Sequence, residues 1–148
     1  MVSLGLLVLR TVIGGIMMLH GYPKLFGGEG KAEQISDDAK EKLGEGFVEF
    51  VEQGGIENTT GMMDQLGVPN PKANALAVSL VEFGGGLLLV LGWMTRPAAL
   101  AIAFTQGVAI AKVHKDQGVV GGYEFNATLI AGAVCLALAG PGKLSVDR

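Results

Sequence analysis

The chain contains a single cysteine, Cys135, and only two histidines among its 148 residues. One cysteine excludes an intrachain disulfide, a CxxC redox pair and a cysteine-rich metal site. Two histidines without an HxxxH or ExxH spacing do not indicate haem or a metal centre, so we expect no intrinsic cofactor. The sequence also contains no phosphate-binding GxxxxGK[ST] loop, dinucleotide fingerprint or nucleophile elbow.

Basic residues are few and dispersed. Eleven Lys and Arg stand against fourteen Asp and Glu, which gives a formal net charge of −3. Without a basic cluster, nucleic acid is not an expected partner. Ten of the fourteen acidic residues lie between residues 29 and 64. This acidic stretch is interpreted as a solvated face rather than an ion site, since charge runs usually are.

Apolar residues make up 49% of the chain and are gathered into long runs. About 20 apolar residues in a helix match the ~30 Å hydrocarbon layer of a bilayer. The first run has no basic residue before it and carries Arg10 inside, so we expect a retained span rather than a cleaved signal. The runs predict membrane spans over residues 2–22, 72–93, 97–113 and 119–139.

These spans predict an all-α fold, with residues 1–148 forming one membrane-embedded four-helix bundle. Four spans place both termini on the same side of the membrane. A long polar loop, residues 25–71, joins the first two spans and is expected to carry short surface helices. Residues 37–55 combine apolar and acidic positions in a pattern typical of one amphipathic surface helix, and residues 59–67 predict a second, shorter one.

Glu82 is the only carboxylate in the second predicted span. An ionisable group at mid-depth costs ~2.5 kcal/mol or more unless it has a partner or faces water. Arg10 lies at the centre of the first span and is the predicted partner, because a guanidinium can hold a carboxylate through two hydrogen bonds. The pair is either a structural salt bridge or part of a proton relay or substrate site.

The predicted topology brings further polar residues to one membrane face. His20 and Lys24 end the first span, His114 ends the third, and Glu124 begins the fourth. With Glu82 they would form a polar funnel, in which the candidate catalytic residues are His20, Glu82, His114 and Glu124. The alternatives are histidines bonded to carbonyls, lysines anchored at lipid headgroups, and a helix-start cap made by Glu124 with Asn126.

Several motifs resemble those of the DoxX family of small four-span membrane proteins. They are LLVLR and LHGYPKLFGG in the first span, LGVPNP and VEFGGGLLLVLGWMTRPAAL around the second, AKVH after the third, GGYEFNATL at the fourth, and the closing GPGKLSVD. The resemblance implies a multi-pass protein of a bacterial or archaeal inner membrane. Some members are linked to thiosulfate oxidation with quinone, to terminal oxidases or to oxidative-stress enzymes. The matching polar positions are Arg10, His20, Lys24, Glu82, Arg96, His114 and Glu124.

Three functions stay open at this point. The first is a redox-associated subunit that binds a quinone in the polar funnel and is not catalytic alone. The second is an accessory or assembly subunit, held in the lipid bilayer with protein partners or with further copies of itself. The third is a small-anion carrier, in which Arg10, Lys24 and Arg96 would bind the anion.

Overall fold

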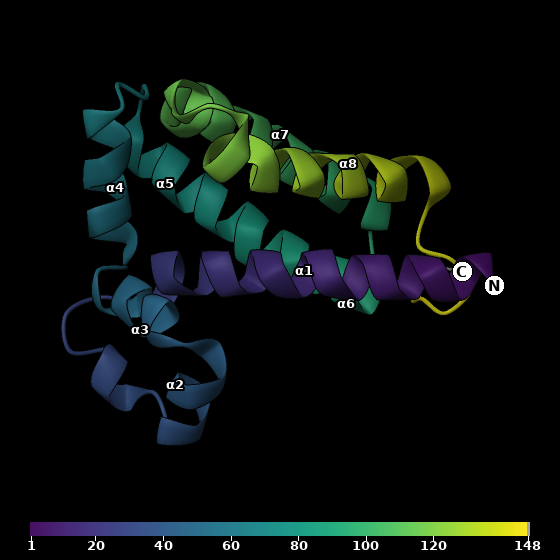
Figure 1. The fold of residues 1–148 in the computed structure, drawn as a ribbon, viewed down its shortest axis with the longest axis horizontal. Coiled ribbons are helices and arrows are strands. Elements are labelled where there is room, and N and C mark those ends of the chain that lie inside the picture. Colours follow the sequence, from purple (N-terminus) through teal and green to yellow (C-terminus); the bar gives the residue numbers. More distant parts are fainter. Residues whose placement is uncertain (148) are drawn as a thin grey trace. The chain divides into compact units, whose positions relative to one another are not determined.

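The computed structural model describes residues 1–147, and every regular element in them is helical. The prediction of an all-α fold is therefore confirmed. The chain divides into two compact units. Met1–Met18 and the chain from Gly84 onward form the terminal unit, and Leu19–Phe83 form the loop unit. Helix α1, Val2–Phe26, contributes to both (Figure 1).

Within residues 1–147, three helical segments are long and apolar enough to cross a membrane, namely Val2–Phe26, Pro71–Leu91 and Val119–Ala139. The last is not straight, because the backbone is non-helical from Val120 to Gly122 and the regular helix α8 begins at Glu124. The predicted span 97–113 falls on α7, Thr95–Ala109, which continues into a π-helical turn, Ile110–His114. The number of spans stays a prediction.

The terminal unit contains the first part of α1 together with α6 (Gly86–Leu91), α7 and α8 (Glu124–Ala139). Helices α7 and α8 lie side by side along most of their length (Figure 1). The buried side chains Leu89, Ile102 and Leu136 come from three different helices of this unit. Helices α1 and α6 meet at Gly14, where an added Cβ would lie 2.5 Å from the carbonyl oxygen of Gly86.

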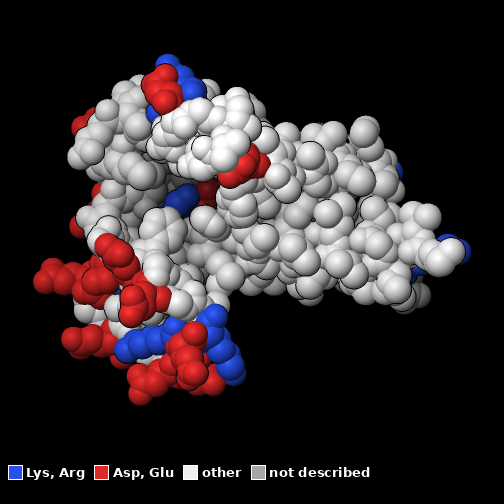
Figure 2. Space-filling model, viewed as in Figure 1, with Lys and Arg blue, Asp and Glu red and all other residues white. Residues whose placement is uncertain are grey.

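The loop unit contains α2 (Asp37–Leu43), α3 (Glu45–Glu52), α4 (Ile56–Gln65) and α5 (Pro71–Leu80). The prediction of one surface helix over 37–55 is wrong, because α2 and α3 are separate. Gly44 divides them with φ 85° and ψ 163°, a conformation that glycine adopts without steric cost. The shorter helix predicted over 59–67 corresponds to α4. Acidic and basic side chains gather over α2 and α3 (Figure 2).

Helix α1 extends through Pro23 to Phe26, one turn beyond the predicted end at residue 22. The carbonyl oxygen of Pro23 accepts hydrogen bonds from the amides of Gly27 and Gly55, both at 2.9 Å. An added Cβ at Gly54 would lie 2.1 Å from that same oxygen. Glycines therefore let the α3–α4 turn pack directly on the end of α1, which carries the polar residues of interest.

Candidate functional site

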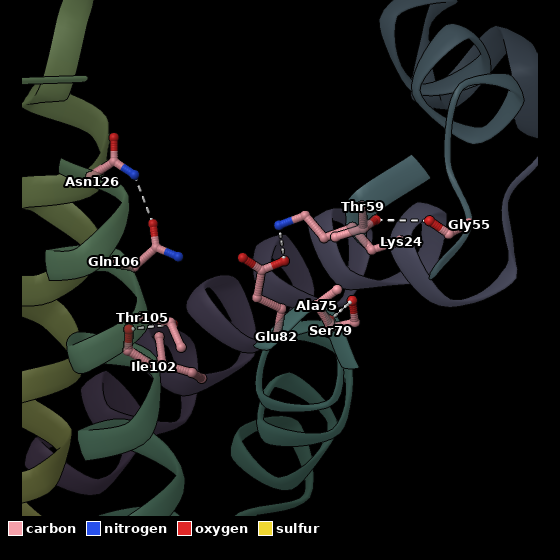
Figure 3. A network of polar contacts seen from close by, with 10 residues as sticks. All are labelled: Lys24, Gly55, Thr59, Ala75, Ser79, Glu82, Ile102, Thr105, Gln106 and Asn126. Atoms are coloured by element: carbon pink, nitrogen blue, oxygen red, sulfur yellow. Dashed lines mark hydrogen bonds and ion pairs between the residues drawn. The ribbon is translucent and has the colours of Figure 1, made fainter. Parts of the chain in front are cut away.

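An ion pair joins two of the helices of the loop unit. The Nζ of Lys24 lies 2.5 Å from Oε2 of Glu82, and the two side chains are 15% and 6% exposed. Lys24 lies in the last turn of α1, and the side chains point toward one another (Figure 3). A buried pair with this contact is expected to be strongly coupled, because little solvent screens it.

Glu82 belongs to a π-helical turn, Val81–Gly85, between α5 and α6. Such turns insert an extra residue into a helix and are frequent at functional sites. The turn lies against α1, since an added Cβ at Gly21 would be 2.3 Å from the amide nitrogen of Phe83. This close approach of two backbones brings the carboxylate of Glu82 within reach of Lys24.

Aromatic rings also pack together near the end of α1, on the face opposite Lys24, because Tyr22 and Phe26 each lie two positions from it. The ring of Tyr22 lies 5.1 Å from Phe26, 6.2 Å from Phe47 and 6.3 Å from Phe83. These rings come from α1, α3 and the Glu82 turn. His20 lies one turn before Lys24, on the same face of α1, and its ring meets Phe50 edge-on at 6.2 Å. The loop unit thus combines cation, carboxylate, imidazole and aromatic surface.

Arg10 does not have the predicted partner. Its guanidinium donates to the carbonyl oxygens of Leu89 at 3.2 Å and Val90 at 2.6 Å, and also to that of Leu144. Glu82 instead pairs with Lys24. The carbonyl oxygen of Leu89 also accepts from the amide of Gly92 at 3.1 Å. Carbonyls at the end of α6 thus offer Arg10 an uncharged alternative to a carboxylate. The Arg10 side chain is 2% exposed and ties α1, α6 and the closing segment together.

Arg96, a candidate ligand-binding residue, also donates hydrogen bonds to backbone carbonyls. It donates to the carbonyl oxygens of Ala137 at 2.7 Å and Leu138 at 2.9 Å, at the end of α8. A carboxylate oxygen of Asp147 accepts from the amide of Thr95 at 3.0 Å, at the start of α7. The closing GPGKLSVD motif thereby completes helix ends, and the structure gives both arginines capping contacts.

His114 and Glu124 lie in the terminal unit. Nδ1 of His114 is 2.9 Å from Oε1 of Gln117. Glu124 accepts from the amide of Gly121 at 2.9 Å, in the turn before α8, and within residues 1–147 no side chain caps the start of α8 at Tyr123. The helix-start cap considered for Glu124 with Asn126 is therefore not formed. The loop unit brings His20, Lys24 and Glu82 onto neighbouring turns, whereas the assembly of the full predicted funnel stays a prediction.

A polar pair was missed in the sequence. The amide nitrogen of Asn126 on α8 donates to Oε1 of Gln106 on α7 at 2.8 Å, and the two residues are 8% and 5% exposed (Figure 3). The available signal was one buried amide in each of two consecutive apolar helices, which favours an interhelical hydrogen bond. Within residues 1–147, no group of three or more His, Cys, Asp or Glu side chains could hold a metal ion.

Outside the apolar helices, Glu52 organises the glycine-rich segment after α1. Its two carboxylate oxygens accept from the amides of Gly30 at 2.6 Å and Ala32 at 3.0 Å. These backbone hydrogen bonds favour the ionised form and hold the pKa of Glu52 below its usual range. Glu52 therefore connects α3 to the segment that leaves α1.

Comparisons with known proteins agree with this architecture. The DoxX family model matches residues 5–115. Inner membrane protein YphA of Escherichia coli (strain K12) is 36% identical over 107 residues, covering 67% of this chain and 76% of YphA. Inner membrane protein YqjF of the same strain is 37% identical over 97 residues, covering 64% and 73%. The protein named "Putative oxidoreductase CatD" of Bacillus subtilis (strain 168) is 27% identical over 145 residues, covering 98% and 86%. No solved structure matches the chain significantly.

Proposed function

The chain belongs to the DoxX family of membrane proteins, and on that basis we propose that it is a redox-associated subunit of the inner membrane that binds a quinone beside Lys24 and Glu82. The single observation that carries the proposal is the buried ion pair, which lies on the face of α1 that also carries His20 and its contact with the ring of Phe50. Ionisable groups inside apolar helices mark functional sites more often than chance. The name of CatD adds support for redox work.

A quinone head group suits this surface. It is a flat ring that can pack on Phe50 beside His20, with carbonyl oxygens that accept hydrogen bonds. The ammonium of Lys24 has three N–H donors, so it can keep its bond to Glu82 and still donate to a carbonyl oxygen. The quinone's apolar tail would remain among lipid-facing side chains.

The chemistry of the couple assigns further roles. Reduction of a quinone to a quinol takes two electrons and two protons. We assign the proton transfer to His20 and Glu82: each would pass to a ring oxygen a proton that it has first taken up, and would accept that proton in the reverse direction. The electrons would come from, or go to, a partner oxidoreductase. In this proposal the subunit binds the quinone and protonates its ring oxygens, while the partner oxidoreductase exchanges electrons with it.

The test is the affinity of the purified protein in lipid nanodiscs for decylubiquinone. Lys24→Met should weaken binding about tenfold or more, because it removes a charged hydrogen-bond donor. Lys72→Met is the matched control, since Lys72 is an exposed lysine at the start of α5 in the same unit. Equal affinities of the two variants would refute the assignment of the quinone to this pair.

A second candidate is an assembly subunit that docks a partner through the acidic surface of α2 and α3. The observation in its favour is the exposure of most acidic side chains there (Figure 2). Gentle extraction from native membranes, followed by identification of co-purifying proteins, separates the two proposals. A stoichiometric partner that is lost when residues 36–43 are replaced by a neutral linker, with quinone affinity unchanged, would favour assembly.

The anion-carrier proposal receives less support. Arg10 and Arg96 direct hydrogen bonds to backbone carbonyls, and Lys24 is paired with Glu82. An anion would have to displace these protein acceptors. Flux of thiosulfate into vesicles, compared with vesicles lacking the protein, tests this alternative directly.

A further inference from the structure

The amide pair of Gln106 and Asn126 is only partly satisfied. A primary amide offers two N–H donors and a carbonyl acceptor. The single hydrogen bond between the residues uses one N–H of Asn126 and the carbonyl oxygen of Gln106. Among residues 1–147, no other hydrogen bond reaches the side-chain nitrogen of Gln106 or the side-chain oxygen of Asn126. One donor group and one acceptor group are therefore left over.

These leftover groups are not sealed inside the protein. The side-chain atoms of residues 1–147 that are fully enclosed and lack a partner are Nε of Arg10 and Oγ1 of Thr95. The nitrogen of Gln106 and the oxygen of Asn126 are not among them, so each still touches accessible space. Figure 3 shows the nitrogen of Gln106 pointing away from Asn126, and the oxygen of Asn126 pointing away from Gln106.

An unpaired amide among apolar helices is costly, because hydrocarbon offers it no hydrogen bond. A ligand that carries oxygen on an apolar body would satisfy it. We propose that Gln106 and Asn126 form a second, separate and charge-neutral binding point, within the terminal unit, for a ring oxygen of a quinone or quinol. The identity of this ligand rests on the proposed function.

The chemistry of the pair fits both forms of the ligand. The nitrogen of Gln106 can donate to a quinone carbonyl, and the oxygen of Asn126 can accept from a quinol hydroxyl. If both amides rotate together, their mutual hydrogen bond is kept while the offered donor and acceptor exchange places. Because neither residue carries charge, the pair binds oxidised and reduced forms without a change of protonation.

The experiment uses a photoreactive azidoquinone with mass-spectrometric mapping of the labelled residues, together with decylubiquinone affinity. Labels should fall on α7 or α8, and Gln106→Leu and Asn126→Leu should each weaken affinity about 5- to 10-fold, the effect of one hydrogen bond. Thr105→Val is the matched control, because its hydroxyl is already bonded to the carbonyl of Ile102 at 2.9 Å. This control should bind as the wild type does.

A purely structural amide pair predicts a different result. Gln106→Leu would then lower the unfolding temperature and leave affinity equal to that of Thr105→Val, which overturns the inference. If Lys24→Met abolishes binding in the same series, the proposed function stands and this inference alone fails. Failure of the wild type to bind any quinone overturns both.

A further variant keeps the test decisive if the leucine variants do not fold. The exchange Gln106→Asn with Asn126→Gln keeps two amides and their ability to bond, while it moves the leftover groups by one methylene. We expect the exchanged protein to fold and to bind several-fold more weakly. Unchanged affinity and labelling in the exchanged protein would contradict the inference.

Discussion

The coupling between Lys24 and Glu82 can be measured with a double-mutant cycle. Lys24→Met leaves Glu82 buried without its cation, and breaking a buried pair in this way costs about 3–5 kcal/mol. Because Lys24 is 15% exposed, we expect the lower end, about 3 kcal/mol. The double variant with Glu82→Gln leaves no unpaired charge and should lose only about 1 kcal/mol. The cycle then gives a coupling energy of about 2–3 kcal/mol or more.

The chain contains its own reference pair. Lys42 and Asp38 lie 2.8 Å apart on α2, with side chains 72% and 74% exposed. A solvated pair of this kind contributes about 0.3–0.5 kcal/mol and weakens in salt. Lys42→Met with Asp38→Asn therefore gives the same chemistry in water, at a similar distance.

The assay is the free energy of unfolding in mixed micelles, followed by circular dichroism as sodium dodecyl sulfate is added. Both cycles are run at low and at high salt. The buried pair should keep its coupling in high salt, while the exposed pair should lose most of its own. A coupling for Lys24 and Glu82 within about 0.5 kcal/mol of the surface pair would refute the reasoning from burial.

Three further predictions concern the segment after α1 and the ends of helices. Glu52→Gln should speed tryptic cleavage at Lys31 several-fold, since the Glu52 carboxylate binds the amides of Gly30 and Ala32. Glu49→Gln should not, since Glu49 accepts from the side chain of Gln53 instead. Because the pKa of Glu52 is lowered in the folded state, Glu52 stabilises the fold above its unfolded-state pKa. This stabilisation is lost as the pH falls through the folded-state pKa. Amide exchange in the segment after α1 should therefore rise over that pH range. Arg10→Lys should lower the unfolding temperature more than Arg96→Lys, because Arg10 is buried and a compact ammonium cannot span the carbonyls of α6 and of the closing segment as the planar guanidinium does. Equal shifts in the two lysine variants would count against this role of Arg10.

Glu82 illustrates how far sequence reasoning reached. A lone carboxylate in an apolar run requires a partner. This need follows from the neighbouring residues in the sequence, so it could be predicted. The choice between Arg10 and Lys24 was not. The two cations are fourteen positions apart, or roughly 21 Å along α1, and their level relative to Glu82 depends on the turns between the helices. Only charged partners were considered for Arg10, whereas backbone carbonyls at a helix end compete equally well.

The break at Gly44 and the π-helical turn at Glu82 show a second limit. Apolar periodicity over residues 37–55 favoured one helix, and one glycine costs such a helix only about 1 kcal/mol. The packing of α3 on the end of α1 outweighs a free-energy difference of that size between one helix and two. The π-helical turn likewise depends on contact between Gly21 and Phe83, which lie far apart in the chain.

The sequence by itself determined the all-α class, the family and the apolar helices, because hydrophobic length and composition act along a single stretch of chain. It also determined which ionisable residues need an explanation. The tertiary structure decided their partners: Lys24 for Glu82, helix-end carbonyls for Arg10 and Arg96, and Asn126 for Gln106. Each partner choice depends on distances of a few ångströms between segments that are remote in sequence, and such distances are set only when the helices pack.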